Sequence, residues 1–203
     1  MTIKANTRQS KVARMTLLAL LIAILVVLGY VNIPMPAGLS ITFNMIPVAI
    51  AAIAMGYPGG VIIGGAFGLI SFAQCFGILG ASALGAALVG YSWVLMFIQR
   101  FVSRVMVGLI AAFVFRLMDK TRAPLYIKGA VTGFCAAFFN TLFFMGLLVL
   151  LFGSTPVLQE SMAGRSALAY IIASTGVNAV VEMIVATLIT GAVTVALRKA
   201  RLI

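Results

Sequence analysis

The longest uncharged stretch of the chain constrains its fold most strongly. Residues 15–99 contain no Asp, Glu, Lys or Arg, and residues 129–159 are equally free of charge. One crossing of a bilayer takes about 20 apolar residues, so each stretch holds more than one crossing or a long helix with its loop. Only 8% of the residues are charged, too few to cover a soluble protein of 203 residues with polar surface. The sequence therefore predicts an all-α integral membrane protein.

Glycines, prolines and charged residues divide the chain into six predicted transmembrane helices. We expect helices at residues 15–31, 45–55, from the GYPGG turn of residues 56–60 to residue 72, and at residues 94–117, 125–151 and 167–197. The prolines of residues 32–36 end the first helix, which we expect to be retained and not cleaved as a signal peptide. At residues 74–91 we expect a long loop that contains a short re-entrant helix. The whole chain then forms a single membrane domain, with basic ends at residues 1–14 and 198–203.

The basic residues predict the orientation of the bundle. Six helices with both termini in the cytoplasm place eleven of the 14 Lys and Arg residues, Lys4 and Arg201 among them, on the cytoplasmic side. Only Arg100, Arg104 and Arg165 fall on the outer side. This asymmetry agrees with the positive-inside rule. The formal charge is +11, but the basic residues lie at the ends of apolar segments and do not cluster on one polar face. We therefore expect no nucleic-acid partner.

The chain offers little for catalysis. It has no histidine, only three acidic residues and no GxxxxGK[ST] phosphate-binding motif, so we expect no enzyme activity, no metal site, no cofactor and no ATPase site of its own. Cys75 and Cys135 lack any ligand-like spacing and are expected to be buried thiols. Energy for uphill transport would have to come from elsewhere.

Polar residues inside the predicted helices are the candidates for function, because each one costs insertion energy in lipid. Arg104 and Arg100 lie one turn apart, where they either reach the headgroups or face the bundle to bind a carboxylate or phosphate. Asn140, in the middle of its helix, either binds substrate or makes a structural hydrogen bond. Asn178 and Glu182 share one helix face. A buried carboxylate without a partner would cost several kcal/mol, so we expect Arg104 or Arg100 to pair with Glu182 unless it contacts substrate.

Further polar and aromatic residues complete a predicted amphipathic pocket near the outer side. Asn44 and Gln74 supply neutral donors and acceptors, and Phe72 supplies an apolar wall. Three more aromatic residues are expected at the same level, either in the pocket or in the interfacial aromatic belt: Phe43, Trp93 and Phe101.

Small residues at four-residue spacing indicate close helix packing. Gly60, Gly64 and Gly68 form a ridge that we expect to pack inside the bundle. Ala19 and Ala23 have the same spacing on the first helix, where they form either an internal seam or a docking stripe for a partner.

Four segments together resemble a known family. They are ITFNMIPVAIAAIAMGYPGGVIIGGAFGLISF, FVSRVMVGLIAAFVF, GAVTGFCAAFFNTLFF and VNAVVEMIVATLITGAVTVAL. Their content and order resemble the substrate-binding S components of energy-coupling factor (ECF) vitamin transporters over nearly all of residues 13–199, and most closely the pantothenate-specific members.

This resemblance implies a six-helix protein of the bacterial plasma membrane that captures a vitamin from outside. It then docks on a transmembrane coupling protein driven by two ATPase subunits, toppling in the membrane to carry its closed pocket inward. Ala19 and Ala23 match the docking stripe of the family. In the pantothenate-specific members, Arg104 and Asn140 would contact the vitamin. Folate, riboflavin and cobalamin members share the scaffold, and a stand-alone carrier that uses Glu182 as a proton site is a further alternative.

Overall fold

The structure, a computed structural model, describes residues 7–30, 33–34, 40–200 and 202–203. In these ranges the elements, in chain order, are α1 (Thr7–Tyr30), β1 (Ile33–Pro34), β2 (Ser40–Ile41), α2 (Met45–Ala73), the 3-10 helix η2 (Gln74–Phe76), α3 (Ala83–Val89), α4 (Trp93–Asp119), α5 (Leu125–Phe152), α6 (Pro156–Met162) and α7 (Ala167–Lys199). The chain is predominantly helical, as predicted. The short strands β1 and β2 pair antiparallel.

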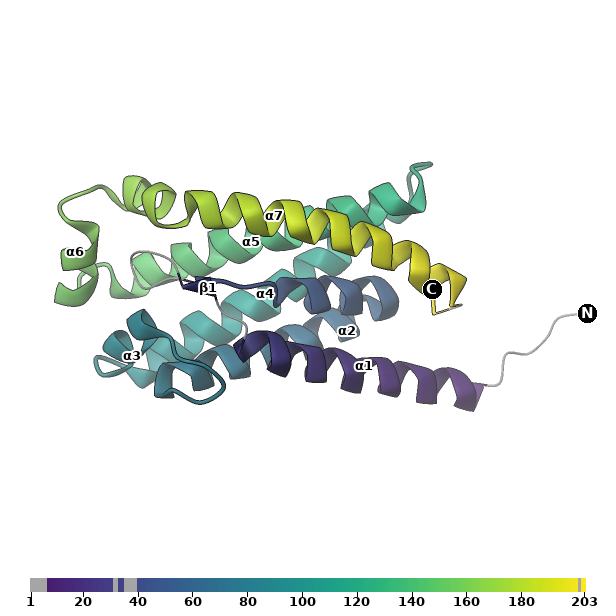
Figure 1. Cartoon of the computed structure of the whole chain (residues 1–203), viewed down its shortest axis with the longest axis horizontal. Helices are drawn as coiled ribbons and strands as arrows, with labels where there is room; N and C mark the ends of the chain where they lie inside the picture. Colours follow the sequence, from purple (N-terminus) through teal and green to yellow (C-terminus); the bar gives the residue numbers. More distant parts are fainter. Residues whose placement is uncertain (1–6, 31–32, 35–39, 201) are drawn as a thin grey trace, which may run out of the picture.

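The α2 helix is a hairpin that reverses at Gly56. This glycine has φ 68° and ψ −149°, a backbone conformation that only glycine adopts without strain. A Cβ added at Gly60 would lie 3.3 Å from Cβ of Ala52. Eight residues of a continuous helix would separate those positions by about 12 Å, so the two arms fold back on each other. The predicted break between residues 55 and 60 is confirmed, and Figure 1 lets the reader follow the reversal.

Five helices of the described residues are long and apolar enough to cross a membrane, when the two arms of α2 are counted as one. The first arm, residues 45–55, would be about 16 Å long at the helical rise of 1.5 Å per residue. The number of six crossings therefore stays a prediction. The helix that was expected to begin at residue 15 begins at Thr7, because basic residues beyond the apolar run do not interrupt a helix. The predicted end of this helix at residue 31 lies outside the described residues. The same is true of three other residues named above: Lys4, Pro36 and Arg201.

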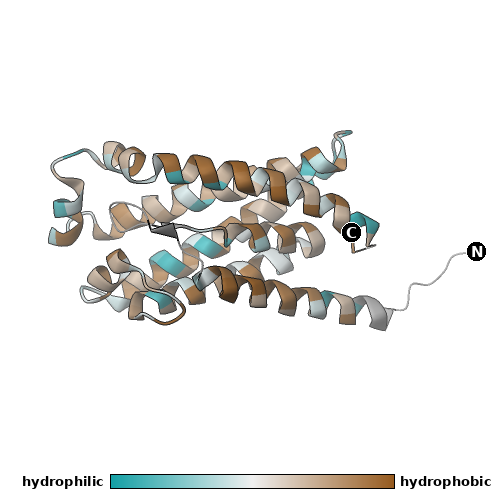
Figure 2. Cartoon of the chain, in the orientation of Figure 1, coloured by the Kyte–Doolittle hydropathy of each residue, from teal (hydrophilic) through white to brown (hydrophobic). Residues whose placement is uncertain are grey.

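The segment between α2 and α4 contains a short helix, as expected, which is α3. The helix α6 was not predicted, because it is only seven residues long and amphipathic periodicity needs a longer window. Figure 1 shows the start of α1 and the end of α7 at one end of the bundle, and α3 and α6 at the other. In Figure 2 most of each long helix is hydrophobic, with hydrophilic residues at the turns and at a few positions in the half that holds α3 and α6.

The glycine ridge of α2 packs inside the bundle, as predicted. A Cβ added at Gly60 would lie 2.4 Å from the backbone oxygen of Gly108, and one at Gly64 would lie 2.6 Å from that of Arg104. At Gly68 the nearest atom would be Cα of Phe101, at 2.9 Å. These distances leave no room for a side chain, so the backbones of α2 and α4 are in contact. The contact fixes the position of Arg104 along the bundle.

The α5 and α7 helices approach each other in the same way. A Cβ added at Gly133 would lie 2.4 Å from the backbone oxygen of Ala186, and one at Gly129 would meet the side chain of Thr194. This packing sets the register between the two helices that carry Asn140 and Glu182.

The α1 helix covers the bundle with a narrow stripe. Leu21, Leu25 and Gly29 are buried, whereas Ala19 and Ala23 are exposed on another face. The internal-seam interpretation of these two alanines is therefore wrong, because the rotation of α1 turns the bulky leucines inward instead.

Candidate functional site

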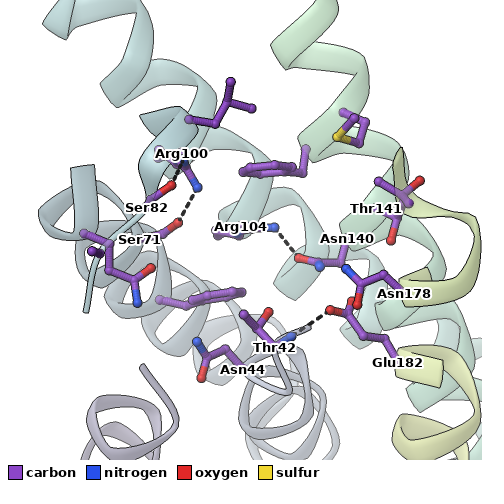
Figure 3. Close-up of a pocket in the computed structure, with 17 residues that line it drawn as sticks. Thr42, Asn44, Ser71, Ser82, Arg100, Arg104, Asn140, Thr141, Asn178 and Glu182 are labelled. Carbon is purple, nitrogen blue, oxygen red and sulfur yellow. Dashed lines mark hydrogen bonds between the residues drawn. The ribbon is translucent and has the colours of Figure 1, made fainter. Parts of the chain in front are cut away.

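A pocket lies between the helices in the half of the molecule that holds α3. Its empty volume is about 760 Å³, including the open space at its mouth. It is lined by Thr42, Asn44, Phe67, Ser71, Gln74, Ala81, Ser82, Leu84, Arg100, Arg104, Asn140, Thr141, Phe144, Met145, Thr175, Asn178 and Glu182. Figure 3 shows Arg100 with Ser71 and Ser82 at one side, Glu182 with Thr42 at the other, and Arg104 with Asn140 between them.

Arg104 is held flat between two aromatic rings. Its Cζ lies 4.5 Å from the ring centroid of Phe67 and 4.5 Å from that of Phe144. Each such contact stabilises a guanidinium by about 0.5–2 kcal/mol. Its Nη1 donates a hydrogen bond to Oδ1 of Asn140 on α5. The side chain is buried, so the headgroup interpretation of Arg104 is wrong.

Arg100 is also buried and fixed by neutral groups. Its Nη1 donates to Oγ of Ser71 at 3.3 Å, and its Nη2 donates to Oγ of Ser82 at 3.0 Å. Ser82 also accepts from the backbone nitrogen of Gly85 at 3.2 Å, which caps the N-terminus of α3. Arg100 therefore links α4 to α2 and to the start of α3, and it does not extend to the headgroups.

Neither arginine makes an ion pair with an acidic residue within the part of the chain that the structure describes. In these residues the one ion pair joins Lys128 Nζ to Asp119 Oδ1, at 3.1 Å, and neither residue lines the pocket. The expected ion pair of Arg104 or Arg100 with Glu182 is therefore absent, although Arg104 and Glu182 lie close enough to attract each other. The arginines have neutral partners instead, because Arg104 donates to Asn140 and Arg100 donates to the two serines.

Glu182 accepts hydrogen bonds from neutral donors instead. Its Oε1 accepts from the backbone nitrogen of Thr42 at 2.9 Å, and its carboxylate also accepts from the side chain of Asn178, one turn earlier on α7. Only 3% of Glu182 is exposed. The segment before α2 and the middle of α7 are thereby joined at one side of the pocket.

Asn44 and Gln74 line the pocket in different ways. Asn44 is 1% exposed, and its Oδ1 has no hydrogen-bond partner among the described residues. The Nε2 of Gln74 donates to the backbone oxygens of Gly29 and Leu79, at 3.1 Å each. Gln74 therefore also ties α1 to the loop before α3.

The structure brings together seven of the eight residues predicted from the sequence for the substrate site: Arg104, Asn140, Asn178, Glu182, Asn44, Gln74 and Arg100. Phe72 is the exception. Its ring packs edge-on against Phe76 and Phe97, at 5.2 and 5.3 Å between centroids, and does not line the pocket. Three other aromatic residues expected at this level are also absent from the lining: Phe43, Trp93 and Phe101.

Phe67, Phe144 and Thr175 line the pocket and were missed by the sequence analysis. Their spacing from the predicted polar residues along each helix could have indicated them. Phe67 lies one turn before Ser71, Phe144 one turn after Asn140, and Thr175 one turn before Asn178. Thr42 and Ser82 were also missed. They precede α2 and α3 in segments without periodicity, so no spacing could have indicated them.

Comparisons with known proteins agree with this architecture. The sequence model described as "ECF transporter, substrate-specific component" matches residues 13–194. The chain is also 27% identical, over 208 aligned residues, to a protein of Lactococcus lactis subsp. cremoris (strain MG1363) named "Pantothenic acid transporter PanT". That alignment covers 96% of this chain and 98% of the relative.

Proposed function

Since this chain belongs to the substrate-specific components of ECF transporters, we propose that its pocket binds pantothenate for import. Membership makes it a multi-pass, vitamin-binding protein of the bacterial plasma membrane that works with an ECF module. The observation that carries the proposal is the burial of Arg100 and Arg104 beside a pocket, where neither makes an ion pair within the described residues. Buried guanidinium groups without a counter-ion are costly, and an anionic ligand would offset that cost.

The charges of the pocket favour a ligand with a single negative charge. Two arginines and one glutamate line the pocket, so the lining carries at least one net positive charge. A carboxylate placed between the guanidinium groups would neutralise it, with charge-assisted hydrogen bonds to both. Because Phe67 and Phe144 hold Arg104 in place, little side-chain entropy is lost when the ligand binds.

Pantothenate satisfies these requirements among the vitamins considered. It has one carboxylate for the arginines, and an amide and two hydroxyls for the neutral groups and Glu182. Folate has two carboxylates, whereas riboflavin and cobalamin have none. The name of the Lactococcus relative supports the same vitamin.

The exposed stripe of Ala19 and Ala23 is the proposed docking surface for the ECF transmembrane protein, which two ATPase subunits would drive. Exposure of small side chains supports this role, because a partner helix can approach them closely. We further propose that the bundle end that holds the start of α1 and the end of α7 faces the cytoplasm. Exposed basic residues at that end, such as Lys120, Arg122 and Arg198, follow the positive-inside rule, and the pocket then opens outward.

A binding panel on the detergent-solubilised protein tests the proposal. Isothermal titration with pantothenate, folate, riboflavin and cobalamin should give saturable binding of pantothenate alone. Pantothenol, in which a neutral hydroxyl replaces the carboxylate, should bind at least about 10-fold weaker, since a hydrogen bond to a charged group contributes about 1.5–3 kcal/mol. Tighter binding of another vitamin, or equal binding of pantothenol, would contradict the assignment.

A further inference from the structure

The pocket has an acceptor side that is separate from its arginine side. Glu182 lies at this side and is anchored through Oε1 to the backbone nitrogen of Thr42. Asn44 lies near Thr42 in Figure 3, and its buried Oδ1 has no partner among the described residues. An ionised carboxylate only accepts hydrogen bonds, and an amide oxygen also accepts. A ligand group that reaches this side must therefore supply donors.

Arg100 lies across the pocket from Glu182, and Arg104 lies between them (Figure 3). The Cζ atoms of Arg100 and Arg104 lie 4.8 and 4.5 Å from the ring centroid of Phe144, so the two positive charges lie close together. No ion pair within the described ranges joins either arginine to Glu182. The pocket is thus polarised, and a ligand that spans it meets positive charge at one end and negative charge at the other.

We propose that Glu182 is a specificity-determining residue that selects the hydroxyl end of the ligand and rejects a second negative charge there. This inference rests on the proposed function. With its carboxylate at the arginines, pantothenate would direct its hydroxyl end toward Glu182, where each hydroxyl can donate. A phosphate ester at the terminal hydroxyl would place an anion beside the buried carboxylate. Repulsion between like charges is strong where water is excluded, so the phosphorylated vitamin is rejected.

The test compares pantothenate with pantothenate phosphorylated on its terminal hydroxyl, by isothermal titration in detergent. Three proteins are used: the wild type, Glu182→Gln and Glu160→Gln. The Glu182→Gln substitution keeps the shape of the side chain and removes its charge. Glu160, on α6, is exposed and does not line the pocket, so Glu160→Gln is the matched control. Gel filtration and thermal melting establish that each variant is folded.

The wild type and Glu160→Gln should bind the phosphate ester at least about 100-fold weaker than pantothenate, since like charges in an interface cost several kcal/mol. Glu182→Gln should reduce that ratio about tenfold or more. The larger size of the phosphate disfavours it equally in all three proteins, so only a charge effect changes the ratio.

Three results would overturn the inference. The first is a folded Glu182→Gln variant in which the ratio of the two affinities is unchanged. The second is a Glu182→Gln variant that binds neither ligand, which would make Glu182 a general binding residue. The third needs no variant and holds even if Glu182→Gln does not fold. If the affinities of the wild type for the two ligands differ by less than threefold, the inference is wrong. Failure of the wild type to bind pantothenate at all would instead overturn the proposed function, and the inference with it.

Discussion

Arg104 on α4 donates a hydrogen bond to Oδ1 of Asn140 on α5, and its guanidinium therefore keeps its full charge beside the pocket. A neutral amide orients the arginine without neutralising it, whereas an acidic partner would do both. The rings of Phe67 and Phe144 complete the support of Arg104. The arrangement is preorganised for an anion, because the positive charge is already desolvated and fixed before a ligand arrives.

Arg104→Ala should weaken pantothenate binding about 10- to 100-fold, since one or more charge-assisted hydrogen bonds are lost. Arg104→Lys should recover only part of this loss, because an ammonium group lacks the planar fork. Titration calorimetry on the purified protein measures both. Arg165→Ala is the control, since Arg165 is exposed and does not line the pocket. Equal affinity of the wild type and Arg104→Ala for pantothenate would show that Arg104 does not contribute to binding.

Asn140→Asp should weaken pantothenate binding more than Asn140→Ala does. The alanine only removes the orienting acceptor of Arg104, whereas the aspartate supplies an internal counter-ion that competes with the ligand carboxylate. The comparison is made by titration calorimetry, with thermal melting to verify folding. If Asn140→Asp binds at least as well as Asn140→Ala, the charge argument for the pocket fails.

Ser82→Ala should lower both stability and ligand affinity. Ser82 caps α3 and accepts from Arg100, so its loss costs about 1 kcal/mol of helix capping and releases one donor of the arginine. The matched control is Ser92→Ala, because Ser92 caps α4 by accepting from the nitrogen of Leu95 at 3.3 Å and does not line the pocket. Both variants should melt at lower temperature, and only Ser82→Ala should bind pantothenate about threefold weaker or more. Equal affinities in the two variants would contradict a role of Ser82 in positioning Arg100.

Gly60→Ala should destabilise the protein by about 1–3 kcal/mol through overpacking, because its Cβ would lie 2.4 Å from the backbone oxygen of Gly108. Gly146→Ala is the control, since Gly146 lies in α5 and its added Cβ would meet nothing within 4 Å. The control should be neutral or more stable by up to about 1 kcal/mol, as alanine favours helix. Thermal melting in detergent measures both. Similar melting temperatures would show that α2 and α4 can separate without cost.

Ala19→Trp and Ala23→Trp should abolish vitamin uptake by the assembled transporter and leave vitamin binding within about twofold of the wild type. Bulky side chains would block close approach of a partner helix, whereas their exposure keeps them away from the core of this chain. Ala173→Trp, also exposed but on α7, is the control and should transport normally. Uptake in reconstituted vesicles and titration in detergent are measured on the same preparations. Normal uptake by both variants would exclude this stripe as the docking surface.

The sequence by itself determined where the long helices lie and which residues are candidates for function. Uncharged stretches and the GYPGG turn predict the long helices and the reversal at Gly56, because burial in lipid depends on local composition. Arg104, Asn140 and Glu182 were identifiable for the same reason, since a polar side chain in an apolar helix has a cost that can be read without knowing its neighbours.

Only the tertiary structure decided which of these groups meet. The sequence analysis expected an arginine to pair with Glu182, whereas Glu182 accepts from Thr42 and Arg104 donates to Asn140. Partners depend on the rotation and axial position of each helix, and contacts between backbones, such as that of Gly60 with Gly108, set both. Such contacts join residues distant in sequence, so local composition and periodicity contain no information about them.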